Sequence, residues 1–144
     1  MRYKLTIEYD GGPYVGWQRL PGSQTVQGAL EDAVEKLTGV RSEVMGAGRT
    51  DSGVHAIGQV AHLELEKHFE PSRLCDALNA HLRPHPISVL NAEGASADFH
   101  ARFSAKRRVY LYTIMNRRAP PAILRGKVWR ISRELDAEAM HTAA

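Results

Sequence analysis

Cysteine and long apolar runs are what this 144-residue chain has least of. The single cysteine, Cys75, cannot form a disulfide within the chain and has no second thiol beside it to indicate a zinc site. We interpret it as a buried packing residue of an apolar helix face, with Leu74 and Leu78, and not as a nucleophile. No apolar run is long enough to span a bilayer, and the start, MRYKLTIEYD, lacks the apolar core of a signal peptide. A cytoplasmic protein is therefore expected.

Acidic residues are missing from one long window of the chain, residues 102–133. That window holds ten lysines and arginines and no aspartate or glutamate, whereas residues 1–101 hold nine basic and thirteen acidic residues. The net charge of +3 for the whole chain is too small to indicate a partner. Protein surfaces normally mix both signs, so a block of one sign indicates an anionic partner. The phosphate backbone of a nucleic acid is the obvious one.

Hydrophobic periodicity predicts a β-α-β-β-α-β order for residues 1–92, the first expected subdomain. Residues 2–9 alternate between apolar and polar types, as a strand with one buried face does. Helices are expected where apolar residues recur every three to four positions between capping or breaking residues. The predicted strands are 2–9, 41–45, 58–65 and 87–90, and the predicted helices lie between Thr25 and Gly39 and between Pro71 and Pro84. This order is typical of a ferredoxin-like α+β fold, an antiparallel sheet with helices on one face.

The rest of the chain is predicted to contain a linker, residues 93–105, and an incomplete second subdomain, residues 106–144. Alternation over residues 109–115 predicts a long strand that opens a new sheet, with 127–131 as a shorter partner. Residues 136–144 begin a helix with no strand after it. We therefore interpret 106–144 as the start of a second, similar subdomain.

The segment that holds the candidate catalytic side chains is GAGRTDSGVHA, residues 46–56, in which glycines surround Arg49 and Asp51. It is not a phosphate loop: the lysine and hydroxyl residue of a Walker motif are absent, and Asp51 replaces the third glycine of GxGxxG. In an extended backbone, residues two apart lie on the same side with Cα atoms about 6.5 to 7 Å apart. Arg49 and Asp51 could therefore form an ion pair, which would keep Asp51 charged, as a nucleophile or general base requires.

The residues of this loop leave other interpretations open. The ion pair could simply brace a glycine-rich loop, because structural pairs also perturb carboxylates. His55 with Asp51 would be half of a metal site, and no further ligands stand at a usable spacing, so no metal is expected. A non-catalytic RNA-binding module and a small-molecule hydrolase with Asp51 as nucleophile are two rival functions. The basic window argues against the hydrolase, which has no use for it.

RTDSGVHA resembles the active-site motif of the tRNA pseudouridine synthase A family. Three flanking segments, YDGGPYVGWQ, TVQGALEDAVEKLTG and FHARFSAKRRVYLYTI, also resemble that family and stand in the same order, so the resemblance covers essentially the whole chain. It implies that Asp51 takes the place of the catalytic aspartate and Arg49 that of the arginine that orients or flips the base. It also implies that Tyr110 takes the place of the tyrosine that stacks on the target uracil.

The resemblance implies an activity: isomerisation of uridine to pseudouridine in the anticodon stem-loop of tRNA, with Asp51 as nucleophile and no cofactor. It implies tRNA as the partner and a homodimer for the full-length protein. Family members continue with a second half, so a fragment with reduced or no activity by itself is expected. Basic residues would hold phosphates. The RNA-binding candidates are Arg19, Lys106, Arg107, Arg108, Arg117 and Arg118.

Overall fold

Strand β1 (Arg2–Tyr9) forms the centre of the fold because every second side chain is apolar. Tyr3, Leu5, Ile7 and Tyr9 point to one face and are buried, while the residues between them are polar and at least partly exposed. The computed structural model describes all of residues 1–144. β1 lies in the first of its two compact units, Met1–Arg108, and the second unit is Val109–Ala144.

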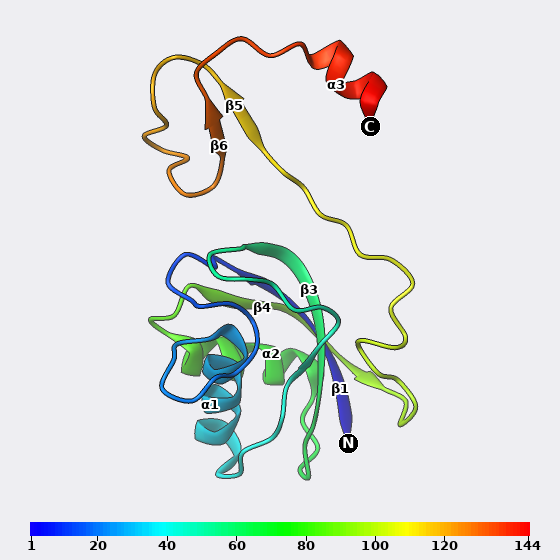
Figure 1. Cartoon of the computed structure of the whole chain (residues 1–144). Coiled ribbons are helices and arrows are strands. Elements are labelled where there is room, and N and C mark those ends of the chain that lie inside the picture. Colours follow the sequence, from blue (N-terminus) through cyan, green and yellow to red (C-terminus); the bar gives the residue numbers. More distant parts are fainter. The chain divides into compact units, whose positions relative to one another are not determined.

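The first unit contains one antiparallel sheet of four strands, in the order β2-β3-β1-β4. Its three long strands, β1, β3 and β4, are labelled in Figure 1. β1 pairs on one side with β3 (Ala56–Glu64) and on the other with β4 (Ile87–Ala95), and β2 (Met45–Gly46) pairs with the far edge of β3. Helices α1 (Val26–Thr38) and α2 (Pro71–Leu82) pack their apolar sides into the same core as the buried face of β1. The predicted ferredoxin-like fold is confirmed.

Both helices begin where the sequence predicts. The Thr25 hydroxyl accepts a hydrogen bond from the Gly28 N–H at 3.1 Å, which caps α1, and Gly39 ends that helix. The Glu70 carboxylate accepts from the Arg73 N–H at 3.1 Å and caps α2. None of the three helices in the structure has the length and apolar content that a membrane crossing requires.

The apolar face of α2 reaches the core through leucines spaced by four, Leu74, Leu78 and Leu82, all of which are buried. Cys75 packs against this core, and its thiol donates a hydrogen bond to the Val89 carbonyl at 3.0 Å. Burial raises the pKa of this thiol above its usual value. Cys75 thus packs on the apolar helix face as expected, but it is only partly buried, because it lies at the edge of the core.

The chain after β4 folds back over the polar face of the sheet. β4 runs to Ala95, well beyond the predicted end at residue 90, because β1 offers a partner as far as Arg2. The Arg2 guanidinium then donates to the Phe99 carbonyl at 2.6 Å, and the Ala101 N–H donates to His62 Nδ1 at 3.1 Å. The first unit accordingly continues to residue 108 and includes the stretch 93–105.

The second unit contains β5 (Ile114–Asn116), β6 (Trp129–Ile131) and α3 (Ala137–Ala143). The two strands pair in parallel. The prediction of a long strand over residues 109–115 is wrong in extent, because residues 109–113 are exposed and outside any strand. A strand needs a hydrogen-bonding neighbour, and β6 supplies one for three residues only.

Candidate active-site loop

The loop that carries Asp51 connects β2 to β3, and its main chain is bound to the segment that follows β1. The Trp17 N–H donates to the Thr50 carbonyl at 2.9 Å, and the Gly53 N–H donates to the Tyr14 carbonyl at 3.2 Å. These bonds lie on either side of Asp51 in the sequence. The backbone of the loop is therefore fixed at both flanks of the candidate catalytic residue.

Two glycines in the segment after β1 allow this close approach. A Cβ atom on Gly11 would lie 2.0 Å from the Val54 carbonyl oxygen, and one on Gly16 would lie 2.7 Å from that of Thr50. Gly16 also has a φ of 121°, which L side chains rarely adopt. Any side chain at either position would push the two segments apart.

His55 joins the end of the loop to the same segment. Its Nδ1 atom accepts a hydrogen bond from the Gly11 N–H at 3.0 Å and lies 3.0 Å from an Asp10 carboxylate oxygen. One nitrogen cannot accept from Gly11 and donate to Asp10 at the same time, so only one of these two hydrogen bonds forms in a given tautomer of His55. No group of three or more histidine, cysteine, aspartate or glutamate side chains could hold a metal ion.

The side chains of Arg49 and Asp51 are exposed, in contrast to the anchored main chain. The ion pair expected between them is absent, and neither side chain appears among the ion pairs of the chain. The expectation rested on spacing in an extended chain, but both side chains are exposed, and an ion pair in water gains little over hydration of the two charges. A turn follows Arg49 and Thr50, in which the Asp51 carbonyl accepts from the Val54 N–H at 3.2 Å. Gly53, with a φ of 78°, completes that turn. Both charged groups are left available to a ligand.

Two of the RNA-binding candidates are engaged within the first unit. The Arg108 guanidinium donates to the Ala47 carbonyl at 3.0 Å and to the Arg102 carbonyl at 2.8 Å, and so holds the start of the Asp51 loop. The Arg19 guanidinium lies 3.3 Å from the carboxylate of Glu31. Two further candidates, Lys106 and Arg107, are exposed.

The other candidates belong to the second unit. Tyr110 is 63% exposed. The Arg117 guanidinium donates to the Ala119 carbonyl at 3.1 Å and to the Pro120 carbonyl at 3.1 Å, so it folds back on its own turn. Arg118 has an exposed side chain. The roles predicted for these residues toward RNA remain predictions.

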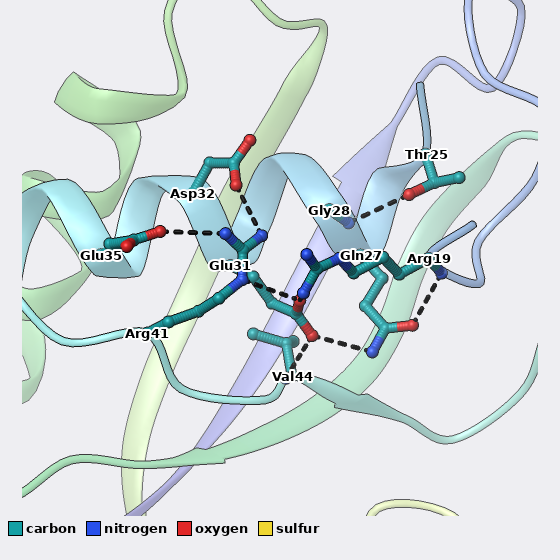
Figure 2. A network of polar contacts seen from close by, with 9 residues as sticks. All are labelled: Arg19, Thr25, Gln27, Gly28, Glu31, Asp32, Glu35, Arg41 and Val44. Carbon is teal, nitrogen blue, oxygen red and sulfur yellow. Dashed lines mark hydrogen bonds and ion pairs between the residues drawn. The ribbon is translucent and has the colours of Figure 1, made fainter. Parts of the chain in front are cut away.

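A buried polar network beside the loop is a feature that the sequence analysis missed (Figure 2). Its centre is Glu31 on α1, which is 3% exposed. One carboxylate oxygen accepts from the Gln27 side-chain amide at 2.9 Å and from the Val44 N–H at 3.2 Å. The other lies 3.3 Å from Arg19 and 3.6 Å from Arg41. The network thus holds the segment that enters β2 against α1.

Arg41 extends this network along the exposed side of α1. Its guanidinium lies 2.6 Å from Asp32 and 2.9 Å from Glu35 (Figure 2). The one signal in the sequence is the spacing of Gln27, Glu31 and Glu35, which places a polar row on the helix beside its apolar positions. That spacing is equally typical of a solvated helix face, so it does not by itself reveal a buried carboxylate.

Comparison with known proteins identifies the family. Residues 5–104 match the sequence model of a family described as tRNA pseudouridine synthase. The chain belongs to this family. Proteins called tRNA pseudouridine synthase A from Nitrobacter winogradskyi and Nitrobacter hamburgensis are each 62% identical to it over 143 residues, and one from Maricaulis maris is 58% identical. Each alignment covers 99% of this chain and 56%, 58% and 57% of the respective relative. The chain thus spans somewhat over half the length of these curated relatives.

Proposed function

We propose that this chain is the Asp51-bearing part of an enzyme that isomerises uridine to pseudouridine in tRNA. The observation that carries the proposal is an exposed carboxylate, free of any ion pair, on a loop whose main chain is fixed on both flanks. Because the Asp51 carboxylate forms no ion pair within the protein, it is available to react with a substrate, and the anchored backbone keeps it in place. Membership of the tRNA pseudouridine synthase family gives that chemistry its class.

The reaction breaks the bond between N1 of uracil and C1′ of the sugar, turns the base, and joins C5 to C1′. C5 loses a proton and N1 gains one, so the atoms balance without an oxidant, a reductant or water, and no cofactor is needed. The Asp51 carboxylate serves either as the nucleophile at C1′ or as the base that starts elimination at the 2′ position. Its exposure allows it to meet the sugar directly.

The target base must leave its stack before the glycosidic bond can be reached. Arg49, exposed and close to Asp51 in the sequence, is suited to enter the stack or to hold the flipped nucleotide. Tyr110, also exposed, supplies an aromatic face for the uracil ring. Lys106 and Arg107 would bind phosphates, which gives affinity and register without reading bases.

The finer parts of the proposal follow from the resemblance. The target is a uridine of the anticodon stem-loop, the full-length protein is a homodimer, and both tRNA and enzyme are in the cytoplasm. Analytical ultracentrifugation of a longer form, one that continues past Ala144 to the length of the curated relatives, tests the homodimer. A monomer at concentrations where the enzyme is active would contradict it.

The test of activity is the conversion of uridine to pseudouridine in a tRNA anticodon arm. Because the two nucleosides have the same mass, the product is detected by the distinct chemical reactivity of pseudouridine. We expect little or no conversion by residues 1–144 alone and full conversion by the longer form. Asp51→Ala in the longer form should lower the rate by at least about 10³-fold, a loss typical of a missing catalytic group, while tRNA still binds. Conversion that survives Asp51→Ala would show that the proposal is wrong.

The acid-free window supports a second candidate, a non-catalytic RNA-binding module. Under this alternative, tRNA binding is the whole function and Asp51→Ala changes nothing. Under either function, affinity for tRNA should fall at least about tenfold when salt rises from roughly 50 to 200 mM, because bound cations are released. Binding that is insensitive to salt would argue against phosphate contacts in both cases.

A further inference from the structure

Tyr9 ends β1 at the point where the sheet meets the Asp51 loop. Its side chain is 2% exposed, and its ring centroid lies 6.0 Å from that of Trp17. Its backbone pairs with Ala56, the first residue of β3. The ring is therefore fixed by core packing and by the sheet, and the direction of its hydroxyl group is fixed with it.

The Tyr9 hydroxyl lies 2.7 Å from the hydroxyl oxygen of Thr50, the residue immediately before Asp51. Thr50 is also held through its carbonyl, which accepts from the Trp17 N–H at 2.9 Å. One bond fixes the side chain of Thr50 and the other its main chain. Together they fix the rotation of the peptide that leads into Asp51.

We infer that Tyr9 is a positioning residue for Asp51, acting through its hydrogen bond to Thr50. No ion pair holds the Asp51 side chain, so the direction of its carboxylate depends on the backbone that carries it. A small rotation at Thr50 would move the carboxylate away from the reacting sugar, and misplacement of about 1 Å is costly to a reaction rate. The inference rests on the proposed function, which makes Asp51 the reacting group.

Tyr3 offers a matched control within the same strand. It lies on the same face of β1, is 0% exposed, and also uses its hydroxyl in the core. Its partner is the backbone of Phe69, whose N–H donates to it at 2.7 Å and whose carbonyl accepts from it at 2.8 Å. Loss of the Tyr3 hydroxyl therefore costs stability at least as much as loss of the Tyr9 hydroxyl, without touching the Asp51 loop.

The test compares four variants of the longer form: Tyr9→Phe, Thr50→Val, Thr50→Ser and Tyr3→Phe. We expect Tyr9→Phe and Thr50→Val to lower kcat for uridine isomerisation about tenfold, with KM changed less than about twofold. Thr50→Ser keeps the hydroxyl and should recover most of the rate. Tyr3→Phe should lower Tm as much as Tyr9→Phe and leave kcat unchanged. The Tyr9→Phe/Thr50→Val double variant should be no slower than either single variant, because both remove the same bond.

The inference is overturned if Tyr9→Phe has a kcat within about twofold of the parent while Asp51→Ala, measured separately in the same assay, is inactive. Equal losses of kcat in Tyr9→Phe and Tyr3→Phe would also overturn it, since they would point to general destabilisation. If Tyr9→Phe does not fold, Thr50→Val against Thr50→Ser decides the matter in the same way. Activity that survives Asp51→Ala would instead remove the proposed function, so the two failures are distinguishable.

Discussion

Glu31 and Asp51 are two carboxylates of the same fold that differ in burial and in the partners of their side chains. Glu31 is 3% exposed and receives an amide, a backbone N–H and two guanidinium groups. Asp51 is exposed and takes part in no ion pair, while the backbone around it is hydrogen-bonded on both flanks. The first site fixes a side chain, and the second fixes a backbone and leaves the side chain free.

The difference follows from the cost of burying charge. A carboxylate taken out of water must be paired and hydrogen-bonded, and once its partners surround it no group is left for a substrate. An exposed carboxylate pays no such cost and keeps its oxygens available, but it needs another source of order. In this protein the order comes from the end of β1, through Tyr9, and from the segment after it, through Tyr14 and Trp17.

The largest effect on stability is expected at Glu31. Glu31→Ala removes the acceptor of the Val44 N–H, of the Gln27 amide and of the Arg19 guanidinium, and one of the three carboxylate partners of Arg41. The free energy of unfolding should therefore fall by about 3 kcal/mol in urea titrations. Glu35→Ala is the control: it removes an exposed partner of Arg41 and should cost about 0.5 kcal/mol. Equal losses in the two variants would mean that burial of Glu31 does not set its importance.

A smaller loss is expected where the two backbones meet. Gly11→Ala places a Cβ atom 2.0 Å from the Val54 carbonyl oxygen, so the segments must separate, at a cost of about 2 kcal/mol by thermal unfolding. Gly58→Ala, on β3, meets nothing within 4 Å and should change stability by less than about 0.5 kcal/mol. If Gly11→Ala were as harmless as Gly58→Ala, the close approach would not be needed to anchor the Asp51 loop.

A further effect depends on pH and concerns His62, which receives the Ala101 N–H on Nδ1. Burial lowers the pKa of His62 below its usual value, His100 and Arg2 lower it further, and Glu64 opposes them. Because the folded form binds the proton less readily than the unfolded form, stability is complete above about pH 6.5, falls as the pH drops from there to the lowered pKa, and levels off below it.

His62→Asn tests this dependence, since an amide oxygen can accept from Ala101 without titrating. The urea midpoint of the parent should fall more steeply between pH 7 and pH 5 than that of His62→Asn. The stability that the parent loses through His62 over this range should be smaller than the loss caused by Gly11→Ala. Parallel pH profiles for the two proteins would rule out His62 as the origin of the acid sensitivity.

The smallest effect on stability is expected at Asp51 itself. Asp51→Ala removes an exposed group that no ion pair holds, so the free energy of unfolding should change by less than about 0.5 kcal/mol in the same urea titrations that detect Glu31→Ala. A loss approaching that of Glu31→Ala would mean that Asp51 is structural, and the contrast between the two carboxylates would collapse.

Local patterns predicted the elements of the first unit well. Alternation from Tyr3 to Tyr9 marks the buried face of β1, and the leucines of α2 recur at the helical spacing. The cap at Thr25 stands where the residue type favours it, and α2 begins at Pro71 as predicted. These features depend on neighbours in the sequence, which is why periodicity and capping rules find them.

Features that depend on distant partners were missed or predicted wrongly. Alternation beyond residue 108 predicts a long strand, but strand length is decided by the pairing partner, and β6 supplies little. The expected pair of Arg49 and Asp51 rested on spacing in an extended chain, whereas both side chains are exposed, where an ion pair gains little, and they form none. The hydrogen bond from Arg108, a phosphate-binding candidate by sequence, to the Ala47 carbonyl was missed, while its role toward RNA stays a prediction.

The sequence by itself determined the helices, the alternation of β1 and, through the RTDSGVHA motif, the identity of Asp51 as the residue of interest. Tertiary structure decided which carboxylate is buried, which is free, and that Tyr9 meets Thr50. The physical reason is the range of the interactions. Propensity, periodicity and capping act over a few residues, whereas burial and hydrogen-bond partners are set where segments far apart in the chain come together.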